Sequence, residues 1–361
     1  MDVGAIVLIE AQRGNDESRS PSGVADSTAA ARFAGGAPAF VDVLGRSVLE
    51  HTVDRLRSAN LKCTSLIVHS DLATSLPVFR QACGDLSIRV ADDPWSAVAS
   101  VLETYSKNGC ECALITRPTA YVEGDLMDLL DFHREGQRVV TRISDRVGPL
   151  DLWVMNCNPT AEIDRNSLMT NLLRLDSFPA SYLVKQYTRR ISHPRDLRHF
   201  VTDAFLNRCH LHPLGEQIRP GVWVDQGVEI HRRACIVAPA YLGARCTIGE
   251  RAVINRFSNI EHDSYIDYGT VIENSSILSN THVGIWLDVR HSIVCGNQLL
   301  NLERDVMVEI CDPRLLRSTL AAPHAKRTPA PEPQRAYASP RPQERLVNRI
   351  SSINTTTEFE S

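Results

Sequence analysis

The chain has 361 residues, of which 43% are hydrophobic and 23% are charged, and its net charge is −4 at neutral pH. This length suffices for two or three domains with sizeable cores, and the slightly acidic balance argues against a protein that coats nucleic acid. The apolar run at residues 5–9 is too short for a signal peptide or a membrane span, so we expect a cytoplasmic protein. The ten cysteines include a single Cys110-x-Cys112 pair, which favours buried thiols over a metal site.

Residues 1–210 alternate between segments typical of strands and segments typical of helices. Leu49, Val53 and Leu56, for example, share one face of an amphipathic helix. Strands are predicted at residues 3–9, 66–69, 112–116, 139–143 and 153–156, and helices at 49–60, 77–83, 96–106, 125–134 and 189–200. This alternation predicts an α/β domain with a mainly parallel sheet over residues 1–210.

From Arg219 onward an aliphatic residue recurs at every sixth position through ten unbroken repeats. The row consists of Val224, Ile230, Ile236, Leu242, Ile248, Ile254, Ile260, Ile266, Ile272 and Leu278. A mostly small residue follows four positions later in each repeat, from Val228 to Ser276. No helix has a period of six, whereas a strand and a corner of six residues cover one face of a triangular prism.

Three such units make one coil, in which the large aliphatic residues point inward and stack on their counterparts one coil away. The repeat predicts a parallel β-helix over residues 219–304, with a register slip of one residue near Val283-Gly284 and weaker units through Val289 and Cys295-Gly296. Residues 318–361 are predicted to form a disordered tail, because their composition, rich in Pro, Ala and Arg, offers little apolar surface to a core.

Two segments of the N-terminal half carry a resemblance to a known family. Residues 41–56 (VDVLGRSVLEHTVDRL) resemble the P-V-x-G-R-P-L-L-E-H segment of sugar-1-phosphate nucleotidylyltransferases, and residues 125–134 (DLMDLLDFHR) resemble the helix after that family's metal-binding Asp. Mannose-1-phosphate guanylyltransferases also place hexapeptide repeats after an α/β domain. The resemblance, which covers residues 1–304, implies a nucleotidyltransferase-like (Rossmann-like) α/β domain followed by a parallel left-handed β-helix.

The chemistry of that family depends on three features near the phosphates, and this sequence departs from each of them. A Gly-rich loop wraps the triphosphate in the family, but here the loop reads Glu10-Ala11-Gln12-Arg13-Gly14. A P-K-P lysine neutralises the phosphates, but here the segment reads Ala37-Pro38-Ala39. An Asp holds the Mg²⁺ that stabilises charge in phosphoryl transfer, but here the chain reads Thr116-Arg117-Pro118-Thr119.

These departures predict a catalytically eroded pyrophosphorylase homologue that acts in binding, regulation or scaffolding of surface polysaccharide metabolism. Its candidate nucleotide-binding residues are Arg13, Gly14 and Arg117, and the sequence indicates no metal site. One alternative is an active sugar-1-phosphate nucleotidylyltransferase with rearranged ligands, and only this alternative requires Mg²⁺.

A second alternative is a hexapeptide-repeat acyltransferase. Such enzymes resemble this repeat region and use a His between subunits as general base, for which His262 and His282 are the candidates here. Under each hypothesis we expect a homo-oligomer assembled through the faces of the solenoid. The expected small-molecule partner is a nucleotide or sugar nucleotide, and no nucleic acid is expected.

Overall fold

The computed structural model describes residues 2–10, 38–75, 86–157, 181–191 and 193–320. The described residues all belong to one compact unit. The predicted tail therefore lies outside the described residues, apart from its first positions. Ser318 belongs to a strand, β28 (Leu316–Ser318), and Leu316 is 1% exposed, so the folded part of the chain extends well beyond residue 304.

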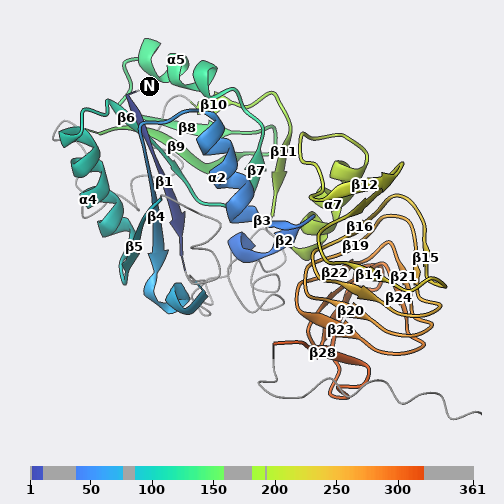
Figure 1. The fold of residues 1–361 in the computed structure, drawn as a ribbon. Helices are drawn as coiled ribbons and strands as arrows, with labels where there is room; N and C mark the ends of the chain where they lie inside the picture. The colour runs from blue at the N-terminus through green and yellow to red at the C-terminus, as the bar shows by residue number, and fades with distance from the viewer. Residues whose placement is uncertain (1, 11–37, 76–85, 158–180, 192, 321–361) are drawn as a thin grey trace, which may run out of the picture. The chain divides into compact units, whose positions relative to one another are not determined.

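A seven-stranded sheet forms the centre of the N-terminal half, in the order β10-β8-β9-β6-β1-β4-β5 (Figure 1). Its strands are β1 (Val3–Ile9), β4 (Cys63–His69), β5 (Ser87–Ala91), β6 (Cys112–Thr116), β8 (Val140–Ser144), β9 (Pro149–Asn156) and β10 (Ser181–Leu183). Neighbouring strands are parallel except at β9, which runs antiparallel to both β6 and β8. The predicted strands at residues 3–9 and 112–116 have the predicted bounds, and the sheet is mainly parallel as expected, with β9 as the antiparallel exception.

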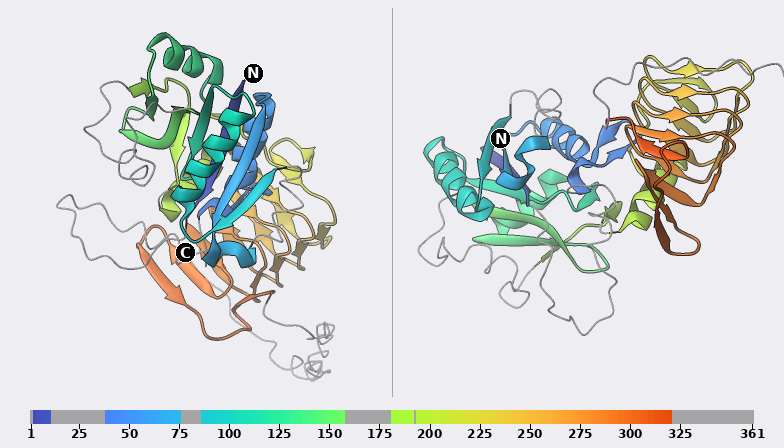
Figure 2. Two further views of the ribbon diagram at one scale, coloured as in Figure 1. Left: turned by 90° about the vertical axis from the view of Figure 1, so that its left-hand side faces the viewer. Right: turned by 90° about the horizontal axis from the view of Figure 1, so that it is seen from below.

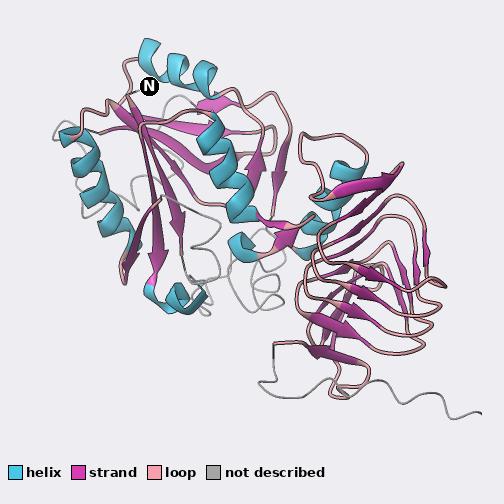
Figure 3. Ribbon diagram, viewed as in Figure 1, coloured by secondary structure: helices cyan, strands magenta, loops and turns pink. Residues whose placement is uncertain are grey.

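Helices cover both faces of this sheet (Figure 3). They are α2 (Val48–Ser58), α4 (Pro94–Lys107) and α5 (Leu126–Glu135). The helix α7 (Pro194–Phe205) packs instead in a separate core that includes solenoid residues such as Tyr241. Side chains of α2 and α5 pack with alternate residues of β1, such as Val7, in one core, and α4 packs with the intervening residues, such as Leu8, in another. The alternation of β1 side chains between two cores explains why this strand is apolar at every position. The predicted helix at residues 77–83 lies outside the described residues.

Residues 42–47 form a hairpin of β2 (Asp42–Val43) and β3 (Arg46–Ser47), preceded by a short 3₁₀ helix, η1 (Pro38–Phe40). Ser47 then caps α2 in a capping box with Glu50. Gly45, in the hairpin turn, has a φ of +99°. A Cβ atom there would lie 2.3 Å from the hydroxyl of Tyr241, so a residue larger than glycine would displace the hairpin.

Short parallel strands stack into three sheets over the C-terminal half (Figure 2). The first sheet contains β13 (Val222–Val224), β16 (Ala240–Leu242), β19 (Ser258–Ile260), β22 (Ser276–Ile277) and β25 (Ser292–Cys295). The second contains β14 (Glu229–Ile230), β17 (Thr247–Ile248), β20 (Tyr265–Ile266) and β23 (Thr281–Val283), and the third contains β15 (Cys235–Ile236), β18 (Val253–Ile254), β21 (Val271–Glu273) and β24 (Asp288–Arg290). The chain visits the three sheets in turn, which gives three strands to each coil of the solenoid.

Antiparallel strands complete the sheets at the two ends of the solenoid. The strand β12 (Glu216–Arg219) pairs with β13 at one end. The hairpin β26 (Gln298–Asn301) and β27 (Val306–Glu309) extends from β25, and β28 pairs with β23. Smaller elements in the N-terminal half are η2 (Ser70–Ser75) and an antiparallel pair, β7 (Ala120–Val122) with β11 (Thr188–Arg190).

The coil length confirms the period of six. Val222 pairs with Ala240, and Ala240 with Ser258, eighteen positions apart in each case. The aliphatic residues from Leu242 to Ile272 are at most 1% exposed and pack together inside the coils. The beginning of the row is more open, since Ile230 is 38% exposed.

The register slip occurs one unit earlier than predicted. Ile260 pairs with Ile277, seventeen positions later, so Ile277 continues the interior row that was assigned to Leu278. Leu278 instead packs in the core shared with the helix α7. The row of small residues shifts by one position as well, so that Ser275 takes the place that was predicted for Ser276. The two neighbouring aliphatic residues, Ile277 and Leu278, made the two registers equivalent in the sequence.

Buried hydroxyl groups satisfy the backbone at the shortened coils. Ser264, Thr270 and Ser275 each donate to a carbonyl fourteen positions later, in the next coil. The same three hydroxyls accept from the N–H groups of Thr281, Leu287 and Ser292, each seventeen positions later. Because a buried hydroxyl without a partner is costly, this double role accounts for polar side chains inside the coils.

Substitution within the aliphatic row tests the register. We predict that Ile254→Asp lowers the free energy of unfolding by more than about 4 kcal/mol, because it buries an unpaired carboxylate. Ile230 has the same place in the repeat but is 38% exposed, against 0% for Ile254, so Ile230→Asp should change the stability by less than about 1 kcal/mol. Urea denaturation measures both. Equal effects of the two substitutions would contradict the register.

Candidate functional site

The carboxyl ends of β1 and β6 and the start of β9 bring three charged side chains together. Glu10 follows β1, Arg117 follows β6, and Asp151 lies near the start of β9. Ligands of open α/β sheets bind outside the carboxyl ends of the strands. Strand alternation places these three residues on the α4 face of the sheet, beside Trp95 and Trp153.

Arg117 forms the centre of this cluster. Its Nη2 lies 2.8 Å from Oε2 of Glu10, and its Nη1 lies 3.4 Å from Oδ2 of Asp151. The other oxygen of Glu10 accepts from the indole N–H of Trp95 at 2.7 Å, and Thr119 donates to Asp151 at 3.0 Å. The two carboxylates therefore already have a cation and a neutral donor each. A guanidinium lies between the two carboxylates and already neutralises them, so these residues do not fit a metal ion.

Two residues beside this cluster have buried donor groups without a hydrogen-bond partner in the part of the chain that the structure describes. These donors are the Nε and Nη1 groups of Arg142 and the indole N–H of Trp153. Arg142 and Trp153 are directly paired across β8 and β9, so their side chains share a face. Burial lowers the pKa of Arg142, while Asp151 nearby opposes that effect. The donors of both residues are suited to an acceptor such as a carbonyl or phosphate oxygen.

A basic pocket lies further along the same edge, at the carboxyl ends of β8 and β10. Its volume is about 510 Å³, and its charged lining consists of Asp145, Arg146, Lys185, Arg189, Arg190 and Asp196. Arg190 donates to Asp145 at 2.9 Å and to the carbonyl of Pro149, two residues before Asp151. The hydrogen bond from Arg190 to Pro149 thus links the basic pocket to the strand that carries Asp151 of the Arg117 cluster.

The acidic groups of the basic pocket are already paired. Burial alone would raise the pKa of Asp145, but hydrogen bonds from Arg190, Gly148 and Val147 lower it overall. Arg189 forms an ion pair with Asp203 at 2.5 Å. Arg146 and Lys185 are exposed, and neither pairs with a carboxylate among the described residues. These two cations leave a net positive charge that favours an anionic ligand.

Of the three predicted nucleotide-binding residues, the structure places Arg117 at this edge. Arg13 and Gly14 lie outside the described residues. Sequence reasoning missed Asp151, Arg142 and Arg190, which come from the late strands of the domain. Their signal was a charge within or beside an otherwise apolar strand, as in Val140–Ser144 and Pro149–Asn156.

His262, a candidate in the acyltransferase hypothesis, lies against the β2–β3 hairpin. Its Nε2 is 3.0 Å from Oδ2 of Asp42, and its Nδ1 is 2.9 Å from Oδ2 of Asp263. The hydrogen bond to Asp42 is the main reason why the pKa of His262 rises to about 9. The imidazole is therefore protonated at neutral pH, and a protonated imidazole cannot accept a proton as a general base.

Beside His262, Glu261 has a carboxylate that is fully buried. It accepts from the backbone N–H groups of Leu44 and Gly45, both at 2.9 Å, and from Asn259 at 2.7 Å. Burial, together with the negative charge of Asp42, raises the pKa of Glu261 to about 7. Glu261, which follows the inward-pointing Ile260, thus joins the solenoid to the β2–β3 hairpin.

The second acyltransferase candidate, His282, lies on another sheet of the solenoid, β23. Its ring stacks on Tyr265 with centroids 5.3 Å apart, and its Nε2 lies 3.7 Å from Asp267. Burial lowers its pKa, so the ring is neutral at neutral pH. His262 and His282 therefore lie in different environments, one against Asp42 and the other against Tyr265.

Comparisons with known proteins assign no family. Neither a scan against models of protein families nor a search of curated proteins gave a match. Among the described residues, no group of three or more His, Cys, Asp or Glu side chains is arranged to hold a metal ion. Every helix in the described part of the chain is too short or too polar to cross a membrane. The cysteines among the described residues are free thiols.

Removal of the central arginine tests the cluster. We predict that Arg117→Met lowers the free energy of unfolding by about 1–3 kcal/mol at pH 7, because it leaves two partly buried carboxylates unpaired. Arg134→Met is the matched control, since the pair of Arg134 with Glu111 is largely exposed and contributes little. Equal effects at pH 7 would contradict a special role for Arg117.

The junction between hairpin and solenoid predicts a dependence of stability on pH. Both His262 and Glu261 have a pKa that is raised by folding, so each stabilises the native state at low pH. The contribution of Glu261 is lost as the pH rises through about 7, and that of His262 as it rises through about 9. The carboxylates of Asp42 and Asp263 and the guanidinium of Arg245 are the charges around His262.

We therefore expect the free energy of unfolding to fall between pH 6.5 and 9.5, by an amount on the order of 2 kcal/mol, and His262→Gln to remove most of that fall. His231→Gln, in the first coil, should leave the profile unchanged. Urea midpoints across the pH range provide the measurement. A profile in the His262→Gln protein that matches the unmodified chain would refute the assignment.

Proposed function

We propose that the chain is a nucleotidyltransferase-like protein that binds a sugar nucleotide at the carboxyl edge of its α/β sheet without transferring a nucleotidyl group. Such a protein would act in the regulation or scaffolding of surface polysaccharide metabolism. The observation that carries the proposal is Arg117, which bridges Glu10 and Asp151. A fixed guanidinium can bind phosphate oxygens, but it cannot bridge attacking and leaving groups as a metal ion does.

The basic pocket supports the binding half of the proposal. Diphosphates of sugar nucleotides carry negative charge at neutral pH, and Arg146 and Lys185 offer cations that no carboxylate in the described part of the chain neutralises. Transfer from a nucleoside triphosphate depends almost wholly on positioning and charge stabilisation. A site whose central charge is already paired with protein carboxylates retains affinity for anions and loses the means of turnover.

The alternatives remain hypotheses that the same assays address. An active nucleotidylyltransferase would need Mg²⁺ ligands outside the Glu10–Arg117–Asp151 cluster. An acyltransferase would depend on His282, because His262 is protonated. The left-handed winding of the solenoid also stays a prediction.

Self-association through the solenoid is a further part of the proposal. The strand β27 lies at the end of its sheet, and all four of its residues are exposed, including Val306, Met307 and Val308. Trp286 is 65% exposed at a corner, next to Ile285 at 54%. An apolar edge strand and an exposed tryptophan are features of surfaces that pair with another chain.

Calorimetry and a pyrophosphate-release assay test the proposed function. We predict binding of UDP-glucose or GDP-mannose that does not require Mg²⁺, and no pyrophosphate release from nucleoside triphosphates with glucose 1-phosphate or mannose 1-phosphate. The double substitution Arg146→Ala with Lys185→Ala should weaken the binding at least about tenfold, because it removes both unpaired cations. Arg232→Ala, an exposed cation of the solenoid, is the control.

Two results would overturn the proposal. Pyrophosphate release at a turnover of about 1 s⁻¹ or more, which is typical of working enzymes, would show that catalysis survives. Absence of a calorimetric signal with every sugar nucleotide at millimolar concentration would show that the edge is not a ligand site.

A further inference from the structure

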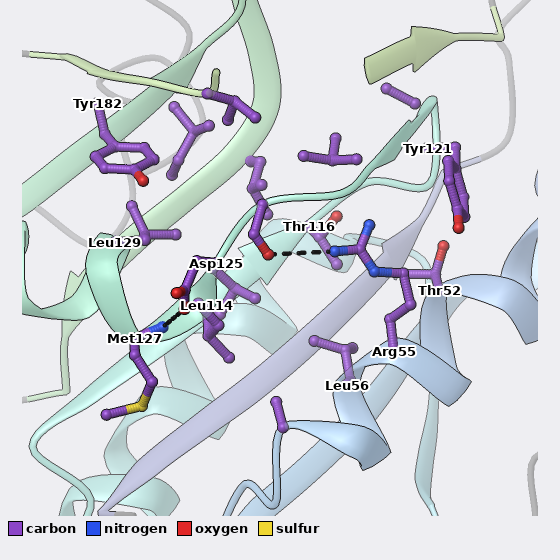
Figure 4. A pocket seen from close by; sticks show the side chains of 18 of the residues that line it. Thr52, Arg55, Leu56, Leu114, Thr116, Tyr121, Asp125, Met127, Leu129 and Tyr182 are labelled. Atoms are coloured by element: carbon purple, nitrogen blue, oxygen red, sulfur yellow. Dashed lines mark hydrogen bonds between the residues drawn. The ribbon is translucent and has the colours of Figure 1, made fainter. Parts of the chain in front are cut away.

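A second pocket lies away from the carboxyl edge, over the face of the sheet between α2 and α5. Figure 4 shows it from close by. Its volume is about 420 Å³. Leu114, Ile143 and Leu152 form its floor on the sheet, and Leu56 and Leu129 lie on the helices to either side. This apolar lining and this size match cavities that bind small molecules.

Arg55 is the one cationic side chain that the structure places in the lining of this pocket. It reaches in from α2, and its Nη2 lies 3.4 Å from the carbonyl of Gly124 (Figure 4). Its guanidinium carbon lies 5.4 Å from the ring centroid of Tyr121. Burial lowers the pKa of Arg55, which indicates that the cation is desolvated. One long hydrogen bond uses little of the donor capacity of a guanidinium.

The acidic residues around this pocket are committed to other partners. Both oxygens of Glu123 bind His210, at 2.5 Å to its backbone N–H and 2.8 Å to its ring. Asp125 caps α5 by accepting from the backbone N–H of Met127 at 2.8 Å. Asp128 accepts from the hydroxyl of Tyr182 at 2.5 Å. Arg55, which is half-buried, therefore forms no ion pair within the described ranges, and Glu123 acts on it only as a nearby negative charge.

We propose that this pocket binds a small carboxylate with an apolar body, whose carboxylate pairs with Arg55. The planar guanidinium presents parallel N–H groups that match a carboxylate, and the leucine and isoleucine floor matches a ring or a short chain. A phosphate monoester fits less well, because its second negative charge would face Asp125 and find no second cation in the lining. The site shares one lining residue, Val184, with the basic pocket, but its cation is a different one, so the inference does not depend on the proposed function.

The size of the cavity limits the ligand. A volume near 420 Å³ lies at the lower end of the range for small-molecule sites, which favours a single ring with a short chain over a fatty acid. Tyr121 and Tyr182 contribute aromatic surface at opposite ends of the lining, as Figure 4 shows. Phenylbutyrate has one ring, a short chain and one carboxylate, so it serves as the probe, and phenylbutanol is its neutral counterpart.

Isothermal titration calorimetry with the full chain tests the proposal. We expect phenylbutyrate to bind with a dissociation constant between about 10 μM and 1 mM, and at least about tenfold more tightly than phenylbutanol. Arg55→Met should remove that preference, so that the two probes bind alike. This variant should fold normally, because it relieves the free protein of a desolvated cation. Arg57→Met, on the same helix but outside the pocket lining, should keep the preference.

A variant that fills the cavity provides the second measurement. Ala120→Leu adds apolar volume to the lining and should abolish binding of both probes, while circular dichroism shows an unchanged fold. Equal affinity of the unmodified chain for phenylbutyrate and phenylbutanol would overturn the proposal. So would unaltered selectivity in Arg55→Met, or unchanged binding in a folded Ala120→Leu protein. None of these outcomes bears on sugar-nucleotide binding, which Arg146 and Lys185 report separately.

Discussion

The buried carboxylate of Glu261 is the interaction on which the arrangement of the folded unit depends. A carboxylate without access to water needs strong donors, and the backbone of the β2–β3 turn supplies two of them. Arg198, from α7, is 5% exposed and donates to Asn259, which in turn donates to Glu261. Burial lowers the pKa of Arg198 to about 9, because its guanidinium has little access to water. Because Ser47 at the end of β3 also caps α2, a solenoid residue helps to fix the helix that carries Arg55.

The same principle explains the carboxyl edge of the sheet. The resembled enzymes balance the charge of their carboxylates with a metal ion, which is bound and released with the substrate. Here a covalently attached arginine balances it permanently. That exchange stabilises the apo protein and removes the positive centre that would organise a triphosphate, while cations elsewhere on the edge stay available. Under the proposed function, the loss of turnover and the binding of an anionic ligand would both follow from this pairing.

The repeat could be predicted from the sequence because one row of side chains determines it, whereas the site depends on contacts between distant strands. An aliphatic residue at every sixth position fits one architecture, a solenoid with three six-residue units in each coil, and the structure has this architecture. The slip was misplaced because Ile277 and Leu278 are interchangeable aliphatics, and their burial in different cores is visible only in three dimensions. The antiparallel direction of β9 leaves no trace in composition. Arg117 was identifiable as an odd residue after β6, but its partners Glu10 and Asp151 come from strands that only the sheet order brings together.

The hydroxyl groups inside the shortened coils also determine how the solenoid tolerates changes in length. Ser264, Thr270 and Ser275 each bond to two backbone groups of the next coil, so these hydrogen bonds between coils are made although the coil is one residue shorter. The stack therefore preserves the spacing between coils rather than the number of residues in each. A single deletion at one of these corners should therefore cost little stability. A repeat protein can then change much of its sequence while it keeps its fold.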